Sequence, residues 1–151
     1  MSEPPLPSAR RQLLFAKYGP ILITPFYFGF STHVLTPSSF TRILGHQWNV
    51  PVVNSLWIGS HIGIGIYLYN SKHLRNAHTF DRILYSIYGS AIFNLGTVLV
   101  MSIVRSIFPD STPLRLGVGL SSSAAMLFIG RRYIQYIDQI FNEIRFRAIT
   151  R

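Results

Sequence analysis

The stretch Pro51–Tyr69, PVVNSLWIGSHIGIGIYLY, decides the fold class. It carries no formal charge, and as an α-helix its 19 residues would rise about 28 Å, close to the hydrocarbon thickness of a bilayer. Ser55, Gly59 and Gly63 recur every four residues, so they would share one helix face and let a neighbouring helix approach closely. The sequence therefore predicts a membrane-spanning helix that packs through this face.

Three other segments also predict membrane spans, at residues 18–35, 83–104 and 114–130. The last is the shortest, since Arg115 lies in its first turn, and it spans only if its terminal arginines reach the two membrane surfaces. With the span at 51–69, these segments predict an all-α polytopic membrane protein built as a four-helix transmembrane bundle.

The third span contains a second set of residues suited to helix packing. Gly89 and Gly96 lie on one side of it, and Asn94 lies at its centre. An amide inside a membrane is expected to form a hydrogen bond to another helix, worth about 0.6 to 2 kcal/mol. The sequence therefore predicts that Asn94 joins two helices.

The remaining segments flank or connect these spans. Residues 1–17 form a basic N-terminal arm, the bundle covers 18–130, and 131–151 carry apolar residues three and four apart, which predicts an amphipathic C-terminal helix. This helix is expected either to lie on the bilayer or to dock on a partner subunit. Segment 114–130 is expected to continue into it as one long helix. Residues 36–50 are expected to be a loop with a short helix that ends at Gly45.

Composition restricts the class of protein. Of 151 residues, 13% are charged and 48% are hydrophobic, and the mean hydropathy of +0.30 is high for a water-soluble domain. The absence of cysteine excludes disulfides and thiolate metal sites. The net charge is +9, but the basic residues lie at the ends of apolar runs, which favours anionic lipid headgroups over nucleic acid.

The basic residues also predict an orientation. With four spans, eleven Lys and Arg residues fall on the side of both termini and three on the other side. Such a bias places the richer side in the cytoplasm or the mitochondrial matrix. The expectation is a multi-pass protein of the mitochondrial inner membrane with both termini in the matrix, or of another membrane with both termini cytoplasmic.

Few residues suggest chemistry. None of the five acidic residues falls inside a predicted span, which argues against an ion pump built on membrane carboxylates, and no catalytic or nucleotide-binding motif is present. His73 and His78 lack a third ligand with suitable spacing, so no metal site is predicted. A basic group at the membrane surface is expected to bind an anionic phospholipid such as cardiolipin, and its members are Lys72, His73, Arg75, Arg131 and Arg132.

His61 is the one candidate for cofactor binding. It is an ionisable residue near the middle of a predicted span, where such a group usually faces a partner or a cofactor. Its imidazole either ligates a haem between helices or hydrogen-bonds to a neighbouring helix. Since no other histidine is predicted at that depth, a haem b with two histidine ligands would need one from another subunit.

The run Ser60-His61-Ile62-Gly63-Ile64-Gly65 resembles part of the small membrane-anchor subunit of succinate dehydrogenase (respiratory complex II), where Ser-His-aromatic-Gly-Ile-Gly occurs in the second membrane helix. The resemblance covers about six residues closely and the first three spans loosely. The haem-ligating position of that family falls on Gly59, and its Asp-Tyr pair, whose tyrosine serves the quinone site, falls on Asn70-Ser71. The resemblance therefore implies an anchor fold but does not carry over the haem or quinone residues.

These observations favour a non-catalytic accessory or membrane-anchor subunit of a mitochondrial respiratory-chain complex, with other membrane subunits as partners and no cofactor of its own. One alternative is an anchor subunit of succinate dehydrogenase associated with haem b and quinone at a subunit interface. Another is a small membrane carrier, channel or import component.

Overall fold

The computed structural model describes residues 24–149, and this part of the chain is all-helical, without strands. The predictions for the arm 1–17, for the start of the first span and for residues 150–151 lie outside the described residues. A helical segment at 24–35 is followed by α2 (Pro37–Tyr69), the short 3₁₀ helix η1 (Leu74–Asn76), α3 (Thr79–Ile107) and α4 (Thr112–Ile149). The predicted fold class is thus confirmed at the level of an all-helical protein.

Among the described residues, α3 and α4 are the helices that are long and apolar enough to cross a membrane. α2, which contains the stretch 51–69, is not one of them, so two of the four expected spans have this support. The apolar windows of α3 and α4 are only 28% and 11% buried within the chain. A core helix of a water-soluble protein would be mostly buried, and these two helices are not.

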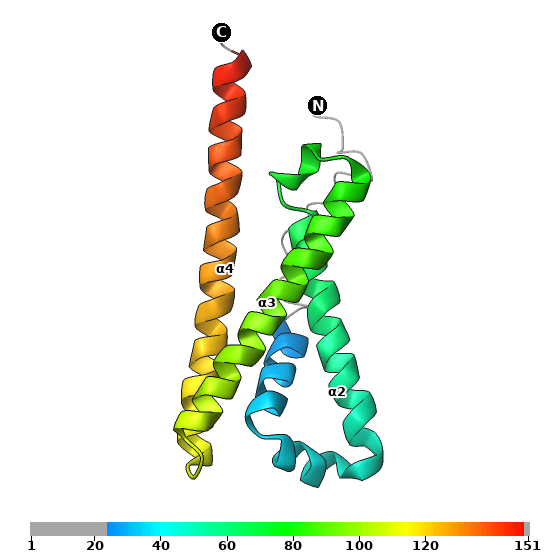
Figure 1. The fold of residues 1–151 in the computed structure, drawn as a ribbon, viewed down its shortest axis with the longest axis vertical. Helices are drawn as coiled ribbons and strands as arrows, with labels where there is room; N and C mark the ends of the chain where they lie inside the picture. The colour runs from blue at the N-terminus through cyan, green and yellow to red at the C-terminus, as the bar shows by residue number, and fades with distance from the viewer. Residues whose placement is uncertain (1–23, 150–151) are drawn as a thin grey trace, which may run out of the picture.

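The expected loop at 36–50 is mostly helical, and that prediction was wrong. Pro37 occupies the first turn of α2, where its missing N–H costs nothing, so it begins a helix rather than excluding one. The predicted stop at Gly45 is present, with φ of 74° and ψ of 165° interrupting α2. Only glycine adopts such backbone angles without strain. The chain therefore bends here, and the part of α2 before Gly45 runs across the end of the bundle (Figure 1).

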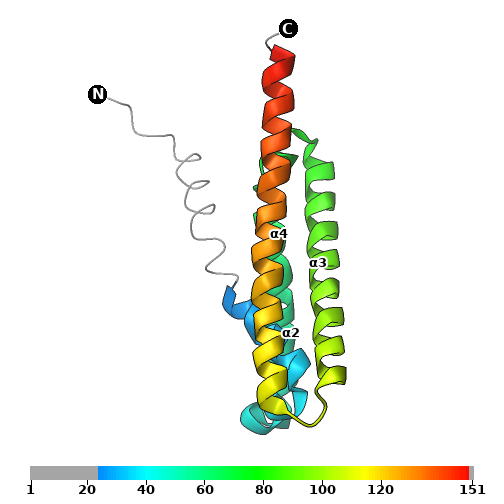
Figure 2. The ribbon, with the colours of Figure 1, turned by 90° about the vertical axis from the view of Figure 1, so that its left-hand side faces the viewer.

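α2 and α4 both pack against α3, and α4 extends beyond the other helices at its C-terminal end (Figure 1 and Figure 2). The loops at 70–78 and 108–111 lie at opposite ends of the bundle (Figure 1). The expectation that segment 114–130 continues into the tail is confirmed, since α4 is one unbroken helix of 38 residues. At 1.5 Å per residue it is about 57 Å long, nearly twice the hydrocarbon thickness of a bilayer.

The helical segment 24–35 is the centre of the packing. Tyr27 and Leu35 on this segment are both fully buried. Leu35 forms an apolar cluster with Met101 and Val104 of α3, while the Gly29 position of the same segment faces the side chain of Leu56 on α2. This short segment therefore contacts the helices on both sides of it.

Polar residues outnumber apolar ones in the interior of the described chain, whereas many large apolar side chains lie on its outside. The buried residues of α3 are largely polar and recur three or four apart, at Ser86, Ser90, Asn94, Thr97, Met101 and Val104. Large apolar side chains of the same helix, among them Leu95 and Leu99, are instead 63% exposed. Water favours the opposite arrangement, whereas hydrocarbon favours this one, because small and polar residues pack and hydrogen-bond between helices in a membrane.

A test of the packing uses two glycines that lie two residues apart on α4. A Cβ atom at Gly119 would meet the Leu35 side chain at 2.4 Å, whereas a Cβ at Gly117 would meet nothing within 4 Å. We expect Gly119→Val to lower the free energy of unfolding by about 1–3 kcal/mol through overpacking. Gly117→Val, the control, is expected to change it little. Thermal unfolding of the purified chain in detergent measures both, and equal losses would contradict the contact between 24–35 and α4.

Candidate functional site

Hydrogen bonds join α2 to α3 through buried polar side chains. The Ser60 hydroxyl donates to Asn94 Oδ1 at 2.7 Å, and Asn94 Nδ2 donates to the Ser90 carbonyl at 2.9 Å. The Ser90 hydroxyl in turn donates to the His61 backbone carbonyl at 2.7 Å. The interhelical hydrogen bond predicted for Asn94 is therefore present, with Ser60 as the partner.

A second polar group surrounds Tyr27. Its hydroxyl lies 3.1 Å from Thr97 Oγ1 on α3 and donates to the Ser123 carbonyl on α4 at 3.4 Å. Its ring packs against Phe28 and Phe93, with centroid separations of 5.7 Å in both cases. One buried side chain thus connects three parts of the chain. No pattern in the sequence distinguishes this tyrosine from the other aromatic residues of the same segment.

The predicted packing face of α2 is present in part, because Gly59 lies at a close helix contact and Ser55 does not. Ser55 is exposed and its hydroxyl donates to the Pro51 carbonyl of its own helix, so it is not at a helix contact in the described chain. Gly59 faces the Phe26 ring of segment 24–35, and Gly63 is half-buried. Ser60 and Ile64 are the buried residues of this helix, and the Ser60 hydroxyl bonds to Asn94 of α3. The face toward α3 is therefore rotated from the predicted stripe by one residue, about 100° around the helix.

The glycines predicted to pack on α3 lie at its contacts with both neighbouring helices. A Cβ at Gly89 would meet the Leu68 side chain of α2 at 2.7 Å, and one at Gly96 would lie 3.7 Å from Met126 of α4. Gly89 therefore allows a close approach of α2, while the space beside Gly96 is less tight.

His61 lies partly exposed on α2. Its Nδ1 is 3.0 Å from the Trp57 carbonyl, and its ring stacks edge-on against the Trp57 ring at 4.7 Å. Because a carbonyl only accepts, Nδ1 carries the proton in this hydrogen bond, and Nε2 keeps a free lone pair. No cluster of three or more His, Cys, Asp or Glu able to hold a metal ion occurs within 24–149.

The Gly59 position is closed to the haem ligand that the resemblance would place there. Any Cβ at this position would meet the Phe26 ring at 2.4 Å. A larger side chain would have to displace segment 24–35 from α2. The residues therefore do not fit a haem bound from this position.

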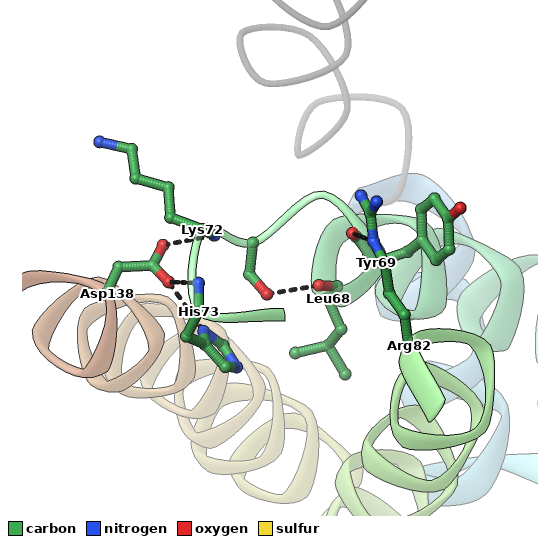
Figure 3. Close-up of polar contacts among 7 residues, drawn as sticks. Leu68, Tyr69, Lys72, His73, Arg82 and Asp138 are labelled. Atoms are coloured by element: carbon green, nitrogen blue, oxygen red, sulfur yellow. Dashed lines mark hydrogen bonds and ion pairs between the residues drawn. The ribbon is translucent and has the colours of Figure 1, made fainter. Parts of the chain in front are cut away.

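The loop after α2 is held to α4 by Asp138 (Figure 3). Asp138 Oδ1 accepts from the His73 backbone N–H at 2.8 Å and lies 2.7 Å from His73 Nδ1, while Oδ2 accepts from the Lys72 N–H at 3.1 Å. The His73 and Asp138 side chains are 15% and 16% exposed. The carboxylate therefore binds two backbone donors and one imidazole, and the sequence analysis assigned it no role.

Arg82 at the start of α3 holds the end of α2 in the same region. Its Nε donates to the Tyr69 carbonyl at 2.7 Å, and its guanidinium lies 3.8 Å from the Tyr69 ring centroid (Figure 3). The last carbonyls of a helix lack partners within the helix and carry partial negative charge. A guanidinium here supplies both a hydrogen-bond donor and a positive charge. The connection between α2 and α3 is thus held by Asp138 from α4 and by Arg82 from α3.

The predicted phospholipid-binding residues divide into two sets. Lys72, Arg75, Arg131 and Arg132 are exposed. His73 is instead half-buried against Asp138, and its ring also lies 6.2 Å from that of Phe141. The structure therefore leaves four of the five side chains accessible to an anionic group.

An apolar groove of about 540 Å³ lies between α3 and α4, with residues of α2 in its wall. Its walls include Leu68, Ile92, Leu127 and Phe128, and Arg131 is the one cation among the residues of 24–149 that line it. Asn94 and the serines at 121–123, which are the polar residues that a channel could use, do not line this groove. No known protein family, curated protein or solved structure matches the chain.

Proposed function

We propose that the chain is a non-catalytic accessory or membrane-anchor subunit of a larger membrane complex, most plausibly of the mitochondrial respiratory chain. The observation that carries this proposal is the inverted distribution of residues, with serine, threonine and asparagine inside and large apolar side chains outside. A bilayer and neighbouring subunits would cover that exterior. The proposal includes all four spans, at 18–35, 51–69, 83–104 and 114–130.

The exposed end of α4 supports a protein partner. The helix is about 57 Å long, so it projects past a bilayer when its apolar half is inside. Phe141 and Ile144 on this end are 50% and 59% exposed. Exposed apolar residues at helical spacing commonly dock in a groove of another protein, so the tail is the part of this subunit that would contact a partner outside the membrane.

The mitochondrial location rests on the basic residues, the absence of cysteine and the similarity to the complex II anchor around His61. Under this proposal the loop at 70–78 and the end of α4 face the matrix, because they hold more Lys and Arg residues than the opposite end. The opposite end, with the loop at 108–111, faces the intermembrane space.

His61 supports a second candidate function, an anchor subunit that shares haem b with another subunit. Its Nδ1–H bond to the Trp57 carbonyl fixes the tautomer that leaves Nε2 able to bind a metal, as metal-binding histidines commonly do. A haem absorbance band that is present in the purified complex and lost in His61→Ala would favour this candidate. A carrier or channel has less support, because the groove is apolar.

Extraction in mild detergent, followed by a native gel and mass spectrometry, tests the subunit proposal. We expect the chain to migrate in an assembly far larger than its own 17.2 kDa. Ile144→Asp is expected to release it, whereas Asn142→Asp, which adds the same charge at an exposed residue two positions away, is expected not to. Migration of the natural chain as a free monomer would refute the proposal.

A further inference from the structure

The groove between α3 and α4 combines an apolar wall with a single cation from the described part of the chain. Its lining is far more apolar than polar, and its polar groups include the phenol of Tyr67 and the guanidinium of Arg131. Its volume of about 540 Å³ is within the range of sites that hold a small ligand. Such a groove suits a molecule with one anionic group attached to a hydrocarbon chain.

Arg131 is available to an anion. It is exposed, and no carboxylate of residues 24–149 forms an ion pair with it. Asp138, two helical turns further along α4, is already bound to the 72–73 backbone and to His73. A guanidinium presents a planar set of donors that matches the oxygens of a phosphate.

The height of Arg131 in the bundle matches the headgroup layer. The uncharged run of α4 ends at Gly130, and the next two residues are arginines. The loop at 70–78, with Lys72 and Arg75, is joined to the same part of α4 through Asp138. Arg131 is therefore at the membrane surface if α4 spans, and Leu127, one turn earlier, is at the depth of acyl chains.

We infer that this groove binds one anionic phospholipid, with its phosphate on Arg131 and part of an acyl chain against Ile92, Leu127 and Phe128. The inference rests on the proposed membrane location. The charge selects the occupant, since an apolar helix of a partner would leave Arg131 without an anion. The bound lipid fills space between α3 and α4 and so stabilises the position of α4, as a ligand specific to the folded state does.

Native mass spectrometry of the purified full chain tests the inference. The chain in detergent micelles is given phosphatidylglycerol or phosphatidylcholine, and the lipid retained after release is counted. We expect one phosphatidylglycerol to be retained in preference to phosphatidylcholine. Arg131→Gln is expected to lower its apparent affinity about fivefold, the effect of one cation at a membrane surface. Arg145→Gln, the control, removes the same charge from an exposed residue of the same helix outside the groove and is expected to have little effect.

A second pair of variants tests the apolar part. Ile92→Trp fills the groove and is expected to remove lipid retention, while Leu99→Trp adds the same ring at a 63% exposed position of α3 outside the lining. Circular dichroism checks that both variants remain helical. A photo-crosslinking residue at Phe128, which also lines the groove, should capture added phosphatidylglycerol.

Several results would overturn the inference. They are equal retention of the two lipids, equal losses in Arg131→Gln and Arg145→Gln, equal retention by the two tryptophan variants, or cross-linking to residues 1–23 or to another protein instead of lipid. Because the purified chain is used without partners, these results are independent of the native-gel test. Release of the chain from membranes by alkaline carbonate would instead contradict the proposed membrane location itself.

Discussion

Tyr27→Ala is expected to lower the free energy of unfolding by about 3–5 kcal/mol, the range for removing a large aromatic side chain from a packed core. Tyr27 is fully buried, and its ring contacts Phe28 and Phe93. Its removal would leave a cavity at the point where segment 24–35 meets α3 and α4. Thermal unfolding of the purified chain in detergent, followed by circular dichroism, measures the loss.

Two further variants separate the contributions of the ring and the hydroxyl. Tyr27→Phe keeps the ring and removes the hydrogen bonds to Thr97 and Ser123. We therefore expect it to lower the free energy of unfolding by only about 1 kcal/mol. Tyr88→Ala removes the same side chain at a position that is 65% exposed, and it is expected to have a smaller effect than Tyr27→Ala. Equal losses for the two alanine variants would contradict a central role for Tyr27.

The periodicity of α3 allowed its interior to be predicted in part. Small and polar residues recur on one side of an apolar helix, and in hydrocarbon that side must face other helices, so the burial and interhelical bonding of Asn94 followed from the sequence. Its partner did not follow. Ser60 lies 34 residues earlier, and its position depends on how α2 is rotated.

That rotation is what the sequence could not determine. Ser60 and the predicted Ser55–Gly63 stripe lie on adjoining parts of the same helix, and both contain residues small enough for close packing. Segment 24–35 occupies the position beside Gly59, which leaves the Ser60 side for α3. Two neighbours thus divide the surface of α2 between them, and this division depends on the whole bundle.

Tyr27 and Asp138 were missed for a related reason. The predicted span 18–35 contains several aromatic residues that hydrocarbon accommodates equally well, and an acid in a basic tail is usually expected in water. Tyr27 is instead buried because Thr97 and Ser123 offer its hydroxyl partners. The available signal for Asp138 was its opposite charge, since it is an acid predicted on the same side of the membrane as the basic loop at 70–78.

Asp138→Asn is expected to free the 70–78 loop from α4. The carboxylate accepts from the backbone N–H groups of Lys72 and His73, and an amide at the same place loses the charge and one of the two acceptor oxygens. Because the Asp138 side chain is only 16% exposed, we expect the free energy that holds the loop on α4 to fall by about 1–3 kcal/mol. Hydrogen exchange at the Lys72 and His73 amides should then rise roughly tenfold to a hundredfold, because 1.4 kcal/mol corresponds to a factor of ten.

Glu143→Gln is the matched control, because it removes the same charge from an exposed residue of the same helix. It is expected to leave exchange in the loop unchanged, and equal effects of the two variants would show that Asp138 acts only through the net charge of the tail. Asp138 lies just before the exposed residues 141–148, so its bonds set the direction in which the end of α4 leaves the bundle. If that end docks on a partner, Asp138→Asn should also weaken the native complex, while the isolated chain stays folded.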